Sequence, residues 1–96
     1  MKPSEALERH RAEVLKVLAD FDVRDAKVFG SVARGEDGDG SDLDLIVELG
    51  ENGRLTDLFR IEDALHAVLG IRVDAHMPPY RDGRFARNVA VDSRSI

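Results

Sequence analysis

The segment Val28–Val47 (VFGSVARGEDGDGSDLDLIV) most constrains what this chain can fold into. An apolar run ends in a glycine-serine pair, Gly30 and Ser31, and a loop rich in glycine and acidic residues follows. Beyond the loop, Asp42 and Asp44 alternate with leucines, which is typical of a strand with one buried face. The segment therefore predicts two strands joined by a tight turn and a flexible acidic loop.

Helical and strand-like patterns surround this segment. The predicted elements are, in chain order, a helix over Ser4–Ala19, a strand over Ala26–Gly30, a helical turn over Ser31–Arg34, a strand over Asp42–Leu49, a helix over Arg54–Leu69, a strand over Ile71–Ala75 and a weaker helix over Tyr80–Val91. Gly70 suits the C-terminal cap of the second long helix. The main order, α-β-β-α-β-α, predicts an α/β (α+β) fold with a small sheet covered by helices on one face.

Length and composition limit the possible classes of protein. A chain of 96 residues is expected to form a single domain over 1–96, because it is too short for two ordinary cores. A net charge of −5 argues against binding long nucleic acids. Cysteine is absent, which excludes disulfides and thiolate metal sites. No signal peptide or membrane-spanning run is evident, so we expect a cytoplasmic protein without membrane contact.

Two aspartates at the start of the second predicted strand form a candidate cation site. Asp42 and Asp44 share one face, with Cα atoms expected about 6.5–7 Å apart. Carboxylates at that separation can share a cation, and Mg²⁺ suits them because it takes a few carboxylates and completes its octahedron with water and phosphates. The alternative is a solvent-facing strand edge.

The glycine-serine pair is a candidate phosphate site. Gly30 lets the backbone approach a bulky anion because it has no Cβ. Ser31 adds a hydroxyl and a backbone N–H, and the first N–H groups of a helical turn starting there would face the same anion. Arg34 either contacts the outer phosphates or pairs with Glu36 or Asp37.

A third aspartate, Asp74, lies on the polar face of the strand predicted over Ile71–Ala75. If that strand lies beside the second one, Asp74 joins Asp42 and Asp44 in a three-carboxylate site for two metal ions. In such a site one ion holds a nucleoside triphosphate and the other activates a hydroxyl, and Asp74 is the natural base. Alone, an aspartate in a strand simply faces water.

These residues together resemble a known signature. Gly30-Ser31, ten residues and then Asp42-x-Asp44 is similar to the motif of the DNA polymerase β-like nucleotidyltransferase superfamily, and Asp74 matches its third carboxylate. The short chain resembles the minimal nucleotidyltransferase (MNT) branch, the MntA-like adenylyltransferase antitoxins that pair with HEPN-domain toxins. The resemblance covers nearly the whole chain.

The resemblance implies a polymerase β-like core with a mixed sheet and two Mg²⁺ ions. It implies that Asp42, Asp44 and Asp74 are catalytic and bind the metal, and that a nucleoside monophosphate is transferred with release of pyrophosphate. For the antitoxin branch it implies transfer of AMP from ATP to a tyrosine hydroxyl of the toxin, within a hetero-oligomer of the two proteins.

A non-catalytic role is the alternative. Larger members of the superfamily have an added domain that holds the acceptor, and this chain is too short for one. Either a separate protein brings the acceptor, or catalysis has been lost. In the second case the protein would be an antitoxin that neutralises its toxin by forming a complex.

Other polar residues have simpler interpretations. The loop resembles an EF-hand superficially, but an aspartate stands where that motif needs glycine, and the flanking segments are predicted strands. Asp37 and Asp39 are therefore expected to be solvated. The three histidines are widely separated and are expected at the surface or in packing contacts rather than as metal ligands: His10, His66 and His76.

Overall fold

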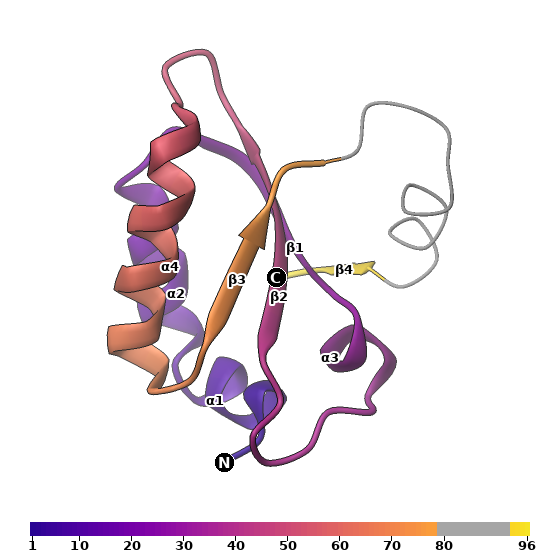
Figure 1. The fold of residues 1–96 in the computed structure, drawn as a ribbon. Coiled ribbons are helices and arrows are strands. Elements are labelled where there is room, and N and C mark those ends of the chain that lie inside the picture. The colour runs from indigo at the N-terminus through magenta and orange to yellow at the C-terminus, as the bar shows by residue number, and fades with distance from the viewer. Residues whose placement is uncertain (79–92) are drawn as a thin grey trace.

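The computed structural model describes residues 1–78 and 93–96, so the helix predicted over Tyr80–Val91 lies outside the described residues. Within them the chain forms four helices and four strands (Figure 1). The helices are α1 (Pro3–Arg9), α2 (Arg11–Ala19), α3 (Ser31–Arg34) and α4 (Leu55–Leu69). The strands are β1 (Val23–Phe29), β2 (Leu43–Leu49), β3 (Val73–His76) and β4 (Ser93–Ser95).

The described strands form one mixed sheet in the order β3-β2-β1-β4. β1 pairs antiparallel with both β2 and β4, whereas β2 pairs parallel with β3. A parallel pair needs a crossover connection, and α4 provides it. The predicted α/β (α+β) fold with a small mixed sheet and covering helices is confirmed.

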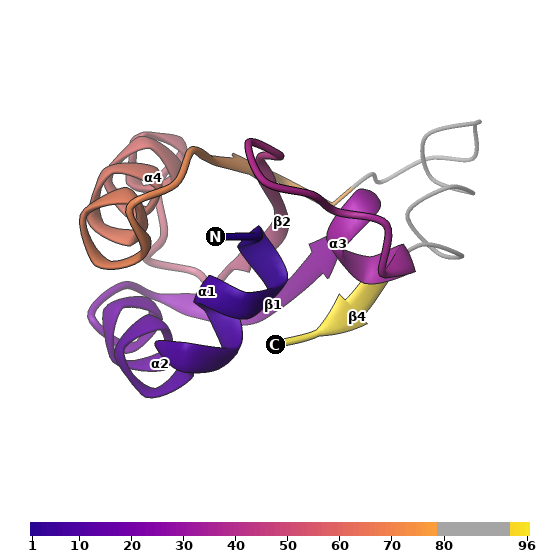
Figure 2. The ribbon, with the colours of Figure 1, turned by 90° about the horizontal axis from the view of Figure 1, so that it is seen from below.

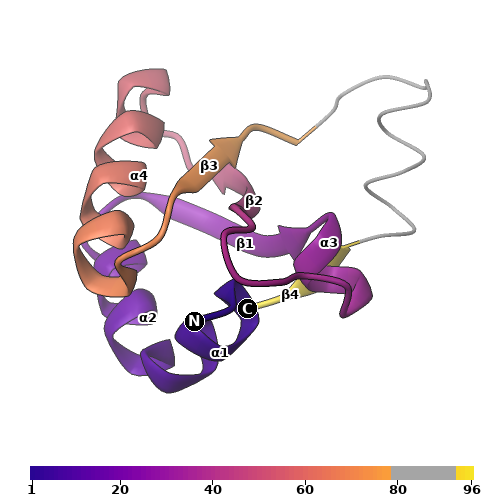
Figure 3. The same ribbon diagram turned by 60° about the horizontal axis from the view of Figure 1, so that its bottom comes forward.

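The longer helices lie on one face of the sheet. α2 and α4 lie side by side there (Figure 2). The short helix α3 follows the end of β1 (Figure 3), and its Val32 and Ala33 belong to the same hydrophobic core as Leu7 of α1. No helix in the described parts of the chain is long and apolar enough to cross a bilayer.

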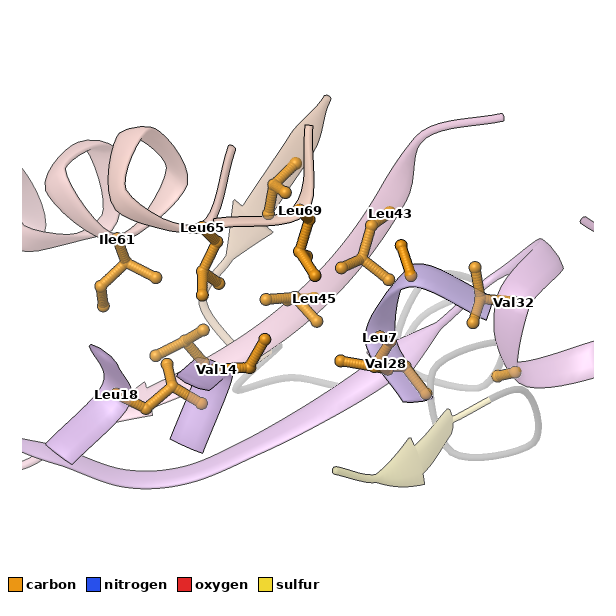
Figure 4. Close-up of a cluster of buried hydrophobic side chains, with 14 of the residues drawn as sticks. Leu7, Val14, Leu18, Val28, Val32, Leu43, Leu45, Ile61, Leu65 and Leu69 are labelled. Carbon is orange, nitrogen blue, oxygen red and sulfur yellow. The ribbon is translucent and has the colours of Figure 1, made fainter. Parts of the chain in front are cut away.

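The core lies between the sheet and helices α2 and α4, and α1 and α3 add buried residues to it. Leu43 and Leu45 of β2 are fully buried, as are Leu65 of α4 and Val14 of α2 (Figure 4). Val47 of β2 is fully buried as well. Burying one such side chain stabilises the fold by about 2 kcal/mol. This burial fixes the register of β2, because a shift by one residue would turn its polar residues into the core.

Three features of the fold differ from the sequence-based expectations. The helix predicted over Ser4–Ala19 is two helices, divided at His10, whose φ of −111° and ψ of 23° are not helical. β1 begins at Val23 rather than Ala26, and its pairing with β2 is irregular between Val23 and Asp25. Strand β4 was not predicted, because three polar residues give no alternating pattern.

Candidate active site

The chain turns sharply where β1 ends. Gly30 has φ 78° and ψ −143°, a conformation that residues with side chains rarely adopt. A Cβ at this position would stand 3.3 Å from Oδ2 of Asp44, tighter than an ordinary contact. α3 begins directly afterwards, so the predicted helical turn over Ser31–Arg34 is confirmed. Glycine thus allows the backbone to pass close to the Asp44 carboxylate.

Asp44 lies at the centre of the candidate site. In the antiparallel pair of β1 and β2 it is opposite Phe29, the residue before Gly30. In the parallel pair of β2 and β3 it is opposite Asp74. The condition for Asp74 to join the site, that the third strand lies beside the second, is met, and two of the three candidate carboxylates are cross-strand neighbours. Asp42, two residues before Asp44, precedes β2.

Two basic side chains of the β3 region face these carboxylates. Nε of Arg72 lies 3.6 Å from Oδ1 of Asp74 and 3.8 Å from Oδ2 of Asp42. Nε2 of His76 lies 3.9 Å from Oδ1 of Asp44. These distances exceed the roughly 2.8 Å of a charge-assisted hydrogen bond, so the contacts are electrostatic and easily exchanged.

The surroundings of Asp44 disfavour its ionised form. Burial raises the pKa of Asp44 above its ordinary value, and the charges of Asp74 and Asp42 raise it further, against the opposing effect of His76 and Arg72. A divalent cation would reverse this penalty by pairing with the ionised carboxylates.

The chemistry of the three carboxylates fits a hard cation such as Mg²⁺, which prefers oxygen ligands. Within residues 1–78 and 93–96, however, no three His, Cys, Asp or Glu side chains are already grouped to hold a metal ion. The guanidinium of Arg72 lies between the carboxylates of Asp42 and Asp74. A metal site formed by the three aspartates therefore requires Arg72 to move.

The candidate phosphate residues surround the start of α3. Ser31 is its first residue and is partly exposed. Nε of Arg34 lies 3.1 Å from Oε2 of Glu36, so the structure shows the ion-pair alternative for this arginine. The Arg34 side chain is 41% exposed, which leaves it accessible from solvent.

The sequence from residue 11 to residue 96 matches the model of the family described as "Nucleotidyltransferase domain". This chain belongs to that family. Protein adenylyltransferase MntA of Thermococcus cleftensis is 39% identical to this nucleotidyltransferase over 69 residues, which cover 72% of this chain and 70% of the relative.

Solved structures agree with the family assignment. A protein assigned to the minimal nucleotidyltransferases is 36% identical, with a TM-score of 0.81 over 97% of this nucleotidyltransferase and 95% of that chain. A chain from the complex of a tri-AMPylated HEPN toxin of Shewanella oneidensis with an MNT antitoxin has a TM-score of 0.66, covering 92% of this chain and 69% of its own. At 16% identity, the second likeness shows a shared fold only. The resemblance to minimal nucleotidyltransferases is confirmed.

Asp37 of this nucleotidyltransferase is buried, so the expectation that it is solvated was wrong. Its Oδ2 accepts a hydrogen bond of 2.9 Å from the backbone N–H of Ser4, in the first turn of α1. Burial raises the pKa of Asp37, but the hydrogen bonds from Ser4, together with the backbone N–H of Asp37 itself and the charge of Lys2, leave the pKa below its ordinary value. The carboxylate thus satisfies a free N–H at the start of a helix and ties the acidic loop to α1.

His76 of this nucleotidyltransferase is an exposed residue with a packing contact, as expected, and it also borders the candidate site. Besides its contact with Asp44, its ring packs edge-on against Phe29, with 6.3 Å between ring centroids. The period-two pattern contained the signal, because residues 72, 74 and 76 share one face of a strand. Arg72 lies on that face as well.

Proposed function

We propose that this nucleotidyltransferase is an Mg²⁺-dependent antitoxin that transfers AMP from ATP to a tyrosine hydroxyl of a partner HEPN toxin, with release of pyrophosphate. The observation that carries the proposal is the pairing of Asp44 with Asp74 beside the Gly30 turn. The names of the related proteins support the choice of donor and acceptor, since one is a protein adenylyltransferase and another is found with an AMPylated HEPN toxin.

One group of site residues would bind the nucleotide donor, ATP, and a second group would bind the metal ions. Gly30 and Ser31 would take the triphosphate, and Arg34 would reach its outer phosphates by leaving Glu36. The three aspartates would hold two Mg²⁺ ions: Asp42, Asp44 and Asp74. When bound, these ions would neutralise phosphate charge and lower the pKa of the attacking hydroxyl.

The strand order suits an in-line displacement. Gly30 and Asp74 lie on opposite sides of Asp44, because β1 and β3 flank β2. With the leaving phosphates near Gly30, the tyrosine oxygen would approach from the side of Asp74. Its bond to the α-phosphorus forms as the bond between the α-phosphorus and the bridging oxygen breaks. Pyrophosphate leaves with the bonding electrons, and Asp74 accepts the tyrosine proton.

Transfer of label from ATP tests this proposal. The protein would be incubated with α-labelled ATP, Mg²⁺ and the proposed partner HEPN toxin. Asp44→Asn is expected to lower labelling of the toxin by about 100-fold or more, because it removes a central ligand. Asp20→Asn, which removes the same charge at the exposed end of α2, should label like wild type.

The toxin supplies a further control in the same assay. Replacing its acceptor tyrosine with phenylalanine should abolish labelling, since the ring remains but the hydroxyl is lost. Equal labelling of the toxin by wild type and by Asp44→Asn would contradict the proposed chemistry.

The alternative is an antitoxin that acts by binding alone. The position of Arg72 between two of the carboxylates favours it, because the described residues hold no ready-made metal site. Survival of cells that express the toxin distinguishes the two functions. If Asp44→Asn protects cells as well as wild type does, neutralisation does not need nucleotide transfer.

A further inference from the structure

Arg72 lies among the residues proposed to bind metal. It comes just before β3, beside Asp42, and its backbone carbonyl accepts the N–H of Leu43 at 2.9 Å. Its side chain is 73% exposed, and its distances to Asp42 and Asp74 are too long for strong hydrogen bonds. A contact of this kind holds the guanidinium only weakly, because solvent screens it.

Two further carboxylates, Glu62 and Asp63 of α4, line a pocket together with Arg72 and Asp74. This open pocket of about 460 Å³ lies between α4 and the β3 region, and it is lined by Glu62, Asp63, His66, Arg72, Val73 and Asp74. Arg72 and Asp74 thus belong both to the group of proposed metal-binding residues and to the lining of this pocket. Glu62 and Asp63 of α4 line the pocket only.

The two α4 carboxylates differ in how firmly they are held. Oε2 of Glu62 accepts the N–H of Ala75 at 2.7 Å, so Glu62 is fixed against the edge strand. Asp63 is exposed and makes no ion pair with any of the described residues. Asp63 is therefore the carboxylate that can receive a cationic group entering the pocket.

We propose that Arg72 is a positioning residue with two alternative sets of partners. Without a divalent cation it lies between Asp42 and Asp74 and neutralises them. When a cation binds to the aspartates, the guanidinium moves into the pocket and pairs with Asp63 and Glu62. A guanidinium and a divalent cation repel each other and need the same carboxylates, so they exclude each other there.

The proposal rests on the metal site of the proposed function, but its test needs no catalysis. Mn²⁺ binding would be measured by isothermal titration calorimetry on the whole chain, without nucleotide or toxin. Arg72→Gln should bind Mn²⁺ about fivefold more tightly than wild type, because the competing charge is gone. Arg72→Lys should stay near wild type, because it keeps that charge. Arg60→Gln, which removes an exposed arginine of α4, should change nothing.

A double-substitution cycle tests the second position of Arg72. Asp63→Asn should weaken Mn²⁺ binding about twofold in the wild-type background, because the displaced guanidinium loses its new partner. In the Arg72→Gln background Asp63→Asn should have no effect on Mn²⁺ binding, since there is no guanidinium to pair with Asp63. A simple long-range attraction between Asp63 and the cation predicts equal weakening in both backgrounds.

Three results would overturn the proposal. These are unchanged or weaker Mn²⁺ binding by Arg72→Gln, an equal effect of Asp63→Asn in both backgrounds, and the absence of Mn²⁺ binding in every variant. Circular dichroism of each variant confirms that it is folded. Transfer of label to the toxin is measured separately, so the proposed function can hold where this inference fails.

Discussion

Gly30 and Gly40 both have positive φ values, 78° and 85°, but only Gly30 lies against a carboxylate. An added Cβ at Gly40 would meet no atom within 4 Å. Alanine at either position should lower the free energy of unfolding by about 1–3 kcal/mol through backbone strain, measured by urea denaturation. Only Gly30→Ala should also weaken Mn²⁺ binding, because it displaces Asp44. Equal Mn²⁺ affinities in the two variants would show that the close approach of Gly30 does not matter.

The raised pKa of Asp44 makes stability depend on pH in a defined direction. The folded protein binds this proton more tightly than the unfolded chain, whose ordinary pKa is 3.8. Stability is therefore lost as pH rises from 3.8 through the raised pKa of Asp44. Asparagine carries no charge, so Asp44→Asn should be more stable than wild type at neutral pH, with the difference shrinking in acid.

Urea denaturation at neutral pH and at acid pH, both with EDTA, measures this difference. Asp20→Asn is the control, since Asp20 is exposed. A variant less stable than wild type at neutral pH would show that the ionised Asp44 is stabilised by its neighbours rather than penalised.

The positions of some residues in and near the site could be predicted from the sequence, and those of others could not. The alternation of polar and apolar residues predicted that Asp42 and Asp44 share one face of their strand and that Asp74 lies on the polar face of its own, because a strand has a strict period of two. Burial of Asp37 could not be predicted, since its partner Ser4 lies 33 positions away in the sequence. The position of His76 beside the site was missed because the strand was predicted to end at Ala75, one residue too early.

At the scale of elements, α4 supports the sheet through one face only. Leu65 is fully buried beneath the sheet, whereas Leu55 on the same helix is 62% exposed. Leu65→Ala should lower the free energy of unfolding by about 3 kcal/mol, because it removes buried surface and leaves a cavity. Leu55→Ala should change it by less than about 0.5 kcal/mol. Thermal or urea denaturation measures both, and similar losses would mean that α4 is packed differently.

The elements that were predicted well have strong periodic patterns. The helix predicted over Arg54–Leu69 matches α4, and Gly70 ends it in the left-handed conformation expected of a cap. The sequence does not mark the break between α1 and α2 at His10, because apolar residues at helical spacing continue on both sides of it. β4 is formed only by its pairing with β1, which no pattern within three residues can reveal.

At the scale of the whole molecule, the candidate site depends on strand order more than on any one motif. β2 lies between β1 and β3, so the Gly30 turn and Asp74 reach Asp44 from opposite sides. The resemblance to polymerase β-like enzymes implied a mixed sheet and a third carboxylate at Asp74, but not this strand order. The sequence could not predict where Arg72 and the pocket beside α4 lie relative to it, because that depends on how α4 packs beside β3.

The parallel pairing of β2 with β3 also orders events during synthesis. A nascent chain that has left the ribosome only as far as α4 carries Asp42 and Asp44 but lacks Asp74. The antiparallel hairpin of β1 and β2 can already form at that stage, because its two strands are close in sequence. The third carboxylate joins only after α4 has crossed over and β3 has emerged, so the site is among the last parts of the fold to be assembled.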